Sequence, residues 1–308
     1  MGKHHARILS SIENIELVGI SDLEEKKGKK IATEYSCEFF SNYEELLKKT
    51  KCIFIATPTN THRDIAIKSL KAKNHIFIEK PISLDINEAE EIIKTAKKSN
   101  LLLQIGHIER FNPALLAAKK FIEKPLFIEA HRLSPFFGRG TDVSVVLDLM
   151  VHDLDIILNT VKSGVKTISA AGVPVLTDNI DIANARIEFE NGAIANVTAS
   201  RISQTKVRKI RFWQKDSYVS VDYLNKKVNI FRKETKNGET EIKEEKVLAS
   251  SEEPLFLQNK AFLDACSGKK LLQFKPEEAK NALALAQNIS EEIKKRTKKI
   301  NFETSPEK

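Results

Sequence analysis

A helical segment in the middle of the chain carries the ionisable side chains best suited to proton transfer. The sequence SVVLDLMVHDLDIILNTV (residues 144–161) is apolar on nearly every side, which predicts a buried helix. Asp148, His152 and Asp155 nevertheless follow at i, i+4 and i+7 on one face. Because burying an unpaired charge is costly, this row requires mutual pairing or a polar cavity. His152 can act as a general base with Asp148 or Asp155 orienting its imidazole, and a purely structural His–Asp pair is the alternative.

A lysine in the first third of the chain is the second candidate for catalysis. Glu79 and Lys80 end the apolar run HIFIEKP (75–81), where Pro81 forces a turn. At the carboxyl end of a parallel strand, a lysine is either a solvated strand end or a cation directed into the ligand crevice. Because the helix 144–161 offers it partners, we expect Glu79 and Lys80 to face the cofactor and Lys80 to take part in catalysis.

Short apolar runs and amphipathic runs alternate through residues 1–106, and these elements must position Lys80. Apolar strands that alternate with helices predict a parallel sheet covered on both faces, which is a doubly wound α/β domain of the Rossmann type. The expected strands are 15–22, 37–40, 52–58, 75–81 and 101–107, and the expected helices between them are 24–35, 42–49, 62–73 and 87–100.

The first residues fit the rear half of a dinucleotide-binding motif. That motif has a strand, the sequence G-x-G-x-x-G, a helix that faces the pyrophosphate, and a second strand ending in an acidic residue. Gly2 opens the expected helix, and Asp22 can accept the ribose hydroxyls and repel a 2′-phosphate, so we expect NAD rather than NADP. A strand before Gly2 is missing from this pattern. It would pair with both 15–22 and 52–58, and its loss would weaken folding and cofactor binding.

A polar segment after the strand 52–58 is a further candidate for cofactor contacts. Thr57, Pro58, Thr59 and His62 follow this strand at the predicted carboxyl edge of the sheet. Such positions border the ligand crevice of doubly wound sheets. An ordinary turn with a cap for the next helix is the other interpretation, and the two are compatible.

Residues 107–308 contain longer segments of alternating polarity than the first part of the chain. They predict an α+β domain with a large, mainly antiparallel sheet and a closing C-terminal helix. Strands with alternating polarity are expected in 125–135, 166–176, 182–203, 207–223 and 226–234. Asn191-Gly192 predicts a hairpin with a type I′ turn. The partly apolar outer strand face IRFWQKDSYVSV suggests a homodimer or homotetramer formed through this sheet.

Composition and charge argue against nucleic-acid partners, membrane partners and a bound metal. The net charge is +8, but the lysines alternate with acidic residues, as on solvated helix faces, so we expect no nucleic-acid partner. No apolar run reaches the length of a membrane span and the first residues lack a signal peptide, so we expect no membrane partner. Cys37, Cys52 and Cys266 are too isolated for a disulfide framework or a metal site, which favours the cytoplasm and no bound metal.

Several motifs together resemble one known family. GKHHARIL, ATPTNTH, EKP, GHIERFNPA and DLMVHDLD, in this order, are similar to the glucose-fructose oxidoreductase / inositol dehydrogenase (Gfo/Idh/MocA) family. The resemblance implies that Lys80, Asp148 and His152 are the catalytic group. Lys80 would hydrogen-bond the reacting hydroxyl, His152 would take its proton, and the carbinol hydride would pass to the nicotinamide. It also implies a cis Lys80–Pro81 bond.

Within the family, GHIERFNPA and the segment 136–155 look most like dehydrogenases that oxidise the C3 hydroxyl of UDP-N-acetylglucosamine to a ketone. Arginines suit the diphosphate of a nucleotide sugar. The predicted substrate contacts are His107, Arg110, Asn112, Arg132, Arg139 and Asp155.

Two alternatives stay open at this point. A polyol, inositol or free-sugar dehydrogenase of the same family would have the same catalytic group. A non-catalytic binding protein would follow if the incomplete glycine motif cannot hold a cofactor.

Overall fold

The computed structural model describes residues 1–138, 143–236 and 239–299, which form two compact units. The first unit consists of Met1–Phe111 and Glu252–Lys280, and the second consists of Asn112–Ser251 and the chain from Asn281. The sequence analysis divided the chain once, between residues 106 and 107. The structure differs because the segment 252–280 returns to the first unit.

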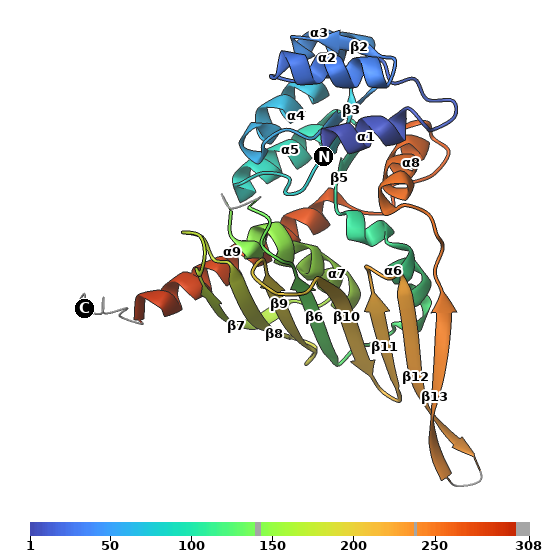
Figure 1. Cartoon of the computed structure of the whole chain (residues 1–308), viewed down its shortest axis with the longest axis vertical. Coiled ribbons are helices and arrows are strands. Elements are labelled where there is room, and N and C mark those ends of the chain that lie inside the picture. Colours follow the sequence, from blue (N-terminus) through green and yellow to red (C-terminus); the bar gives the residue numbers. More distant parts are fainter. Residues whose placement is uncertain (139–142, 237–238, 300–308) are drawn as a thin grey trace. The chain divides into compact units, whose positions relative to one another are not determined.

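The first unit contains the predicted parallel strands in two sheets (Figure 1). One sheet has the order β1–β2 and the other β3–β4–β5, and all pairs are parallel. The strands are β1 (Gly19–Ser21), β2 (Glu38–Phe40), β3 (Cys52–Ile55), β4 (His75–Ile78) and β5 (Leu103–Ile105).

Helices connect these strands and begin where the sequence supplies capping residues. Asn42 and Asp85 accept backbone N–H groups at the starts of α3 and α5, which satisfies donors that a helix start leaves unpaired. The helices of the first unit are α1 (Gly2–Leu9), α2 (Glu25–Glu34), α3 (Tyr43–Lys49), η1 (Thr59–Thr61), α4 (His62–Lys71), α5 (Ile86–Lys98), η2 (Ile108–Phe111) and α8 (Pro254–Cys266), and α9 (Pro276–Lys299) starts there.

Two of the three cysteines, which are isolated in the sequence, lie next to each other in the structure. The thiols of Cys52 and Cys266 hydrogen-bond each other, which lowers the pKa of Cys52 and raises that of Cys266. All three cysteines are free thiols.

The second unit is built on one eight-stranded sheet with the order β13-β12-β11-β10-β6-β9-β8-β7. Among the described strands of this sheet, only β6 and β9 pair in parallel, so the prediction of a mainly antiparallel sheet is confirmed. The strands are β6 (Phe127–Leu133), β7 (Val165–Val173), β8 (Ile182–Phe189), β9 (Ile194–Ser200), β10 (Val207–Gln214), β11 (Ser217–Asp222), β12 (Lys227–Lys236) and β13 (Glu239–Leu248).

Helices cover one face of this sheet, and alternate strand residues fill the core beneath them (Figure 1). On β6, for example, Ile128 and Ala130 are fully buried, whereas Phe127 and Glu129 on the other face are half-buried. The helices of this unit are α6 (Pro113–Ala118), η3 (Lys119–Phe121), the π-helical turn η4 (Val146–Met150), α7 (Val151–Val161) and the larger part of α9. None of the described helices is both long and apolar enough to span a membrane.

The predicted hairpin at Asn191-Gly192 is confirmed, but its predicted turn type is wrong. Gly192 has a φ of +85°, whereas Asn191 is not among the described residues with positive φ, and a type I′ turn needs both. The N–H of Gly192 donates to the Phe189 carbonyl, and the N–H of Phe189 donates to that of Ala193. This is the three-residue loop with a bulge at glycine, and the Asn191 side chain stabilises it by accepting the Ala193 N–H at 3.1 Å.

Candidate active site

Lys80 is the second residue after β4, near the end of the strand that the sequence predicts over 75–81. β4 is buried and apolar, and its neighbours β3 and β5 end at the same edge of the sheet because all three run parallel. The Lys80–Pro81 peptide bond is cis, as the family resemblance implied.

Glu79 is buried and tied to the N-terminal helix. Its carboxylate Oε1 lies 2.7 Å from Nε2 of His5 on α1, and Nδ1 of the same ring lies 3.1 Å from Oδ1 of Asn259 on α8. A Cβ added at Gly106, which follows β5, would lie 3.0 Å from the Glu79 carboxylate. The predicted contact of Glu79 with the cofactor stays a prediction, because its carboxylate is held among α1, α8 and the end of β5.

His62 is also buried, and both of its ring nitrogens face backbone oxygens. Nδ1 lies 3.0 Å from the Pro81 carbonyl and Nε2 lies 3.0 Å from the Thr57 carbonyl. The side chain therefore bridges the turn after β4 and the turn after β3. In that second turn, Thr57 accepts the Thr61 hydroxyl at 2.8 Å.

Asp22 and the start of α1 are the groups that the sequence predicts to contact the cofactor. Asp22 follows β1 directly, its Oδ1 accepts the Glu24 N–H at 2.9 Å, and its Oδ2 lies 3.9 Å from Lys27 Nζ. This half-exposed carboxylate can still accept hydroxyl donors, which is the chemistry that a ribose requires. At the start of α1, a Cβ added to Gly2 would approach only the Ala56 Cβ, at 3.9 Å.

In the second unit, the residues Asp148, His152 and Asp155 sit on a helix that begins with a π-helical turn. Asp148 lies within η4, and His152 and Asp155 lie in α7. Asp148 and His152 are half-buried and Asp155 is buried. The π turn differs from the regular α-helix expected there. Such turns hold extra residues per turn and often occur at functional sites.

An acidic residue that the sequence analysis missed supports the start of this helix. Asp181 is fully buried, which by itself would raise the pKa of its carboxyl group. It accepts the backbone N–H groups of Val175, Leu176 and Thr177 and the Thr177 hydroxyl, and these bonds lower its pKa to about 2. The neighbouring Ile180 carbonyl accepts the N–H of Val145, which precedes η4. The sequence carries no local signal for this role, because Asp181 stands between Ile180 and Ile182 and its burial is known only from the structure.

Two of the predicted substrate arginines are buried in ion pairs. Arg110 pairs with Glu278 and stacks over the Phe274 ring, with 4.5 Å from its guanidinium carbon to the ring centroid. Arg132 forms a two-point pair with Asp153 at 2.7 and 2.9 Å. Both arginine side chains are buried and already bind carboxylates of the protein. A substrate would have to compete with Glu278 for Arg110 and with Asp153 for Arg132.

The other predicted substrate residues have different environments. Asn112 caps α6, where its Oδ1 accepts the Ala114 N–H at 3.1 Å, and its amide donates to the Tyr223 carbonyl at 3.3 Å. His107 is buried after β5. Arg139 lies outside the described residues. Within the described part of the chain, no group of three or more His, Cys, Asp or Glu could hold a metal ion.

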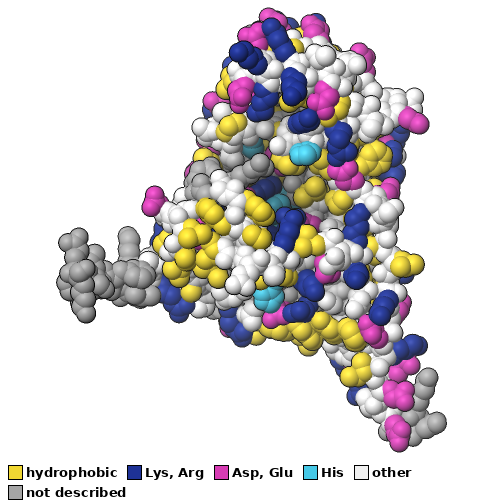
Figure 2. Space-filling model, in the orientation of Figure 1, with side chains coloured by type: hydrophobic (Ala, Val, Ile, Leu, Met, Phe, Trp, Pro, Cys, Tyr) yellow, Lys and Arg dark blue, Asp and Glu magenta, His cyan; other side chains and the backbone are white. Residues whose placement is uncertain are grey.

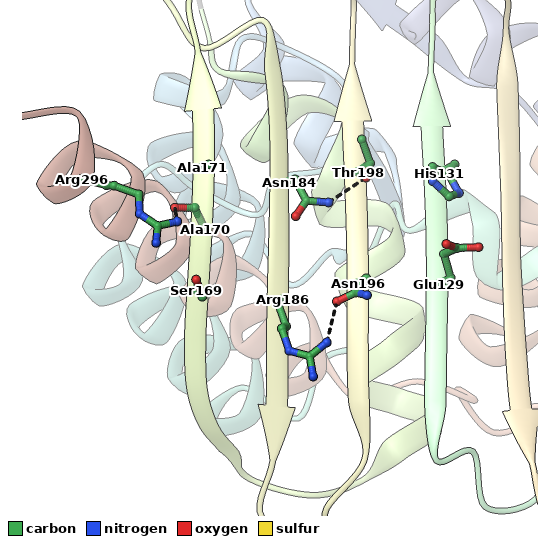
Figure 3. Close-up of a pocket in the computed structure, with 10 residues that line it drawn as sticks. All are labelled: Glu129, His131, Ser169, Ala170, Ala171, Asn184, Arg186, Asn196, Thr198 and Arg296. Carbon is green, nitrogen blue, oxygen red and sulfur yellow. Dashed lines mark hydrogen bonds between the residues drawn. The ribbon is translucent and has the colours of Figure 1, made fainter. Parts of the chain in front are cut away.

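A hollow of about 410 Å³ lies on the outer face of the eight-stranded sheet, and none of the predicted site residues lines it (Figure 3). Its polar groups pair with each other: Asn184 donates to the Thr198 hydroxyl at 2.9 Å, and Arg296 donates to the Ala170 carbonyl at 3.3 Å. These pairs make the hollow a polar surface rather than a catalytic site. Its lining residues are Glu129, His131, Ser169, Ala170, Ala171, Asn184, Arg186, Asn196, Thr198 and Arg296.

A parallel-sheet unit with Asp22 and Lys80 at its strand ends, joined to a unit with a large sheet and a His–Asp helix, defines the class of two-domain nucleotide-dependent oxidoreductases. Residues 1–107 match the oxidoreductase family with an NAD-binding Rossmann fold, and residues 125–214 match the Gfo/Idh/MocA C-terminal domain.

Individual relatives agree with these family matches. The chain is 34% identical over 273 residues to UDP-N-acetylglucosamine 3-dehydrogenase of Acidithiobacillus ferrooxidans, which covers 88% of this chain and 87% of that protein. A solved structure of that dehydrogenase has a TM-score of 0.89 at 32% identity and covers 96% of this chain and 94% of its own. Myo-inositol 2-dehydrogenase of Thermotoga maritima is 26% identical over 220 residues, covering 65% of this chain and 66% of its own.

The chain therefore belongs to the Gfo/Idh/MocA family. It is an oxidoreductase whose cofactor is NAD. The family and cofactor predictions are both confirmed.

Proposed function

We propose that this protein oxidises a sugar hydroxyl to a ketone, and specifically the C3 hydroxyl of UDP-N-acetylglucosamine or a similar nucleotide sugar. The observation that carries the proposal is the similarity to UDP-N-acetylglucosamine 3-dehydrogenase, which extends over most of both chains. Lys80, Asp148 and His152 supply acid–base groups that such an oxidation needs.

The first unit would hold NAD with the start of α1 at Gly2, the Asp22 carboxylate and the turn that contains Thr57, Pro58 and Thr59. Asp22 accepts the ribose hydroxyls, because a half-exposed carboxylate at a strand end is an acceptor for paired hydroxyl donors. When bound, NAD supplies the hydride acceptor.

The chain's own residues act on the oxygen and the proton of the reacting sugar hydroxyl. Lys80 donates a hydrogen bond to the oxygen of the reacting hydroxyl and stabilises negative charge that develops there. His152 removes the hydroxyl proton, and Asp148 orients its imidazole. Proton removal makes the carbon a better hydride donor, so the two steps support each other.

The substrate's diphosphate would be recognised by arginine. We keep His107, Arg110, Asn112, Arg132, Arg139 and Asp155 as proposed substrate contacts. A second candidate substrate class is inositol, since a myo-inositol 2-dehydrogenase also matches the chain.

Turnover with each substrate tests the proposal. The protein and NAD are mixed with UDP-N-acetylglucosamine or with myo-inositol, and NADH absorbance is followed. We expect NADH with the nucleotide sugar. Turnover of myo-inositol alone would replace this proposal with the second candidate.

Site variants test the assigned roles. Lys80→Met and His152→Asn should each lower kcat by about 10²–10⁴-fold, the usual contribution of a general acid–base group. Lys71→Met changes an exposed lysine on α4 and should leave kcat unchanged. A Lys80→Met enzyme with wild-type kcat would remove Lys80 from the mechanism.

We also propose that two or four copies associate through the outer sheet face. Phe127, Trp213, Tyr218 and Phe231 stack in a row across β6, β10, β11 and β12, with ring centroids 4.9–5.2 Å apart. Figure 2 shows hydrophobic side chains gathered across the lower part of this sheet. Eight strands about 4.8 Å apart give a face wide enough for a standard interface. Free thiols suit a reducing cytoplasm, where we place the enzyme.

A further inference from the structure

Two buried histidines hold the chain on either side of Lys80. His5 contacts the side chain of Glu79, the residue before Lys80, and His62 contacts the carbonyl of Pro81, the residue after it. His5 is 2% exposed and His62 is 1% exposed. Neither ring has surface left for a bound ligand, so the two histidines act on the protein itself.

His5 is fixed on several sides. Besides its bonds to Glu79 and Asn259, its ring packs against Phe54 and Phe77, with centroids 5.5 and 5.1 Å apart. These aromatic residues belong to β3 and β4. The imidazole therefore contacts α8 and the sheet from its place on α1. These contacts fix the ring, and the fixed ring in turn holds the Glu79 carboxylate in one position.

Glu79 in turn constrains the backbone at Lys80, because the two residues are consecutive in the chain and Glu79 is held by His5. The N–H of Glu79 also donates to the Ile55 carbonyl at 2.9 Å, which continues the sheet pairing to this point.

His62 acts on the other side of the lysine. Its ring lies between the Pro81 and Thr57 carbonyls, 3.0 Å from each, and a neutral imidazole donates its one N–H to one of them, so the ring packs the turn after Lys80 against the turn after β3. Thr57 belongs to the segment proposed to contact the cofactor. The histidine thus fixes the distance between the lysine turn and that segment.

We propose that His5 and His62 are positioning residues for Lys80, which together fix the backbone of residues 79–81. The proposal rests on the proposed function, in which Lys80 holds the reacting oxygen. It departs from the prediction that His62 and Glu79 contact the cofactor. A misplacement of about 1 Å at a catalytic group can cost about 10²-fold in rate, so loss of either histidine should act mainly on kcat.

The test uses the NAD-loaded full chain with four variants. His5→Phe and His62→Phe keep an aromatic ring but remove the polar ring nitrogens, and each should lower kcat by about 10²-fold while the Kd for NAD changes less than about threefold. His5→Gln and His62→Gln retain a donor and should recover at least a tenth of the wild-type kcat. They also keep the test valid if a phenylalanine variant fails to fold.

Hydrogen exchange supplies a readout that needs no turnover. Peptides covering residues 78–83 should exchange faster in both phenylalanine variants than in wild type, at equal folded fraction. The matched control is His4→Phe, because His4 is the exposed neighbour of His5 on α1, and it should change neither exchange nor kcat.

The outcomes separate the two proposals. If the wild-type protein oxidises no tested sugar, the proposed function fails, but faster exchange at residues 78–83 would still support the positioning role. Unchanged exchange in both phenylalanine variants overturns the positioning role whatever the activity. A Kd for NAD that rises as much as kcat falls would also overturn it, in favour of a cofactor contact.

Discussion

At the scale of single residues, the pair Arg132–Asp153 shows how a buried charge depends on its partner. Both side chains are almost fully buried and meet through two short bonds. Arg132→Met removes the guanidinium that pairs with the buried Asp153 carboxylate, so we expect the free energy of unfolding in urea to fall by about 3–5 kcal/mol. Arg211→Met breaks the half-exposed pair with Glu129 and should cost at most about 1 kcal/mol. Equal losses would contradict this account.

Asp181 gives a prediction about pH. Its folded-state pKa of about 2 lies below the ordinary value of 3.8, so its contribution to stability is present above pH 4 and is lost as the pH falls towards 2. Asp181→Asn should lower the free energy of unfolding by about 2 kcal/mol at neutral pH. The gap between variant and wild type should narrow from pH 4 to pH 2 in urea titrations. A gap that does not depend on pH would contradict the assigned cause.

The sequence predicted most candidate residues of the site but not their contacts. Residue type and strand position select Lys80 and Asp22, and the i, i+4, i+7 spacing on one helix face selects His152. The contact of His5 with Glu79 spans 74 residues, and a purely local pattern carries no signal for it. The same reason explains why Arg110 and Arg132, selected for charge, turn out to be engaged with carboxylates inside the protein.

At the scale of elements, α2 depends on a close approach to β2. Gly28 lies inside α2, and a Cβ there would lie 2.3 Å from the Phe39 ring. Gly28→Ala should therefore destabilise the protein by about 1–3 kcal/mol in thermal or urea unfolding, although alanine is the better helix former. Lys30→Ala, at an exposed position of the same helix, should stay within about 0.5 kcal/mol of wild type. A stabilised Gly28→Ala would show that the ring moves freely.

Elements with strong periodicity were predictable, and those without it were not. The strands and helices of residues 15–107 were found because apolar and amphipathic runs alternate there. β13 was missed because nearly all its side chains are exposed, so only backbone pairing with β12 makes it a strand. The π turn Val146–Met150 has the same residue types as an α-helix, and packing around it decides between them.

At the scale of the whole molecule, the division into two units depends on long-range contacts. The segment 252–280 joins the first unit through contacts such as Asn259 with His5 and Glu278 with Arg110. Those pairs lie 254 and 168 residues apart in the sequence. A boundary placed where the pattern of predicted strands and helices changes along the chain could not show that residues 252–280 pack with the first unit.

The proposed association of copies is a prediction at this scale. Light scattering at micromolar concentration should give the mass of two or four chains. Trp213→Glu places a charge in the middle of the aromatic row and should shift the mass towards one chain, because burying that charge in an interface is costly. Ile242→Glu, at an exposed position of β13, is the control and should leave the mass unchanged. A monomeric wild-type protein would end this proposal.

In the proposed reaction, hydride leaves a sugar carbon for NAD. UDP-N-acetylglucosamine carrying deuterium at C3 can be incubated with the protein and NAD, and the reduced cofactor analysed by mass spectrometry. The account predicts reduced cofactor that carries the deuterium, together with the 3-keto nucleotide sugar. Reduced cofactor without deuterium, or no reduced cofactor at all, would contradict it.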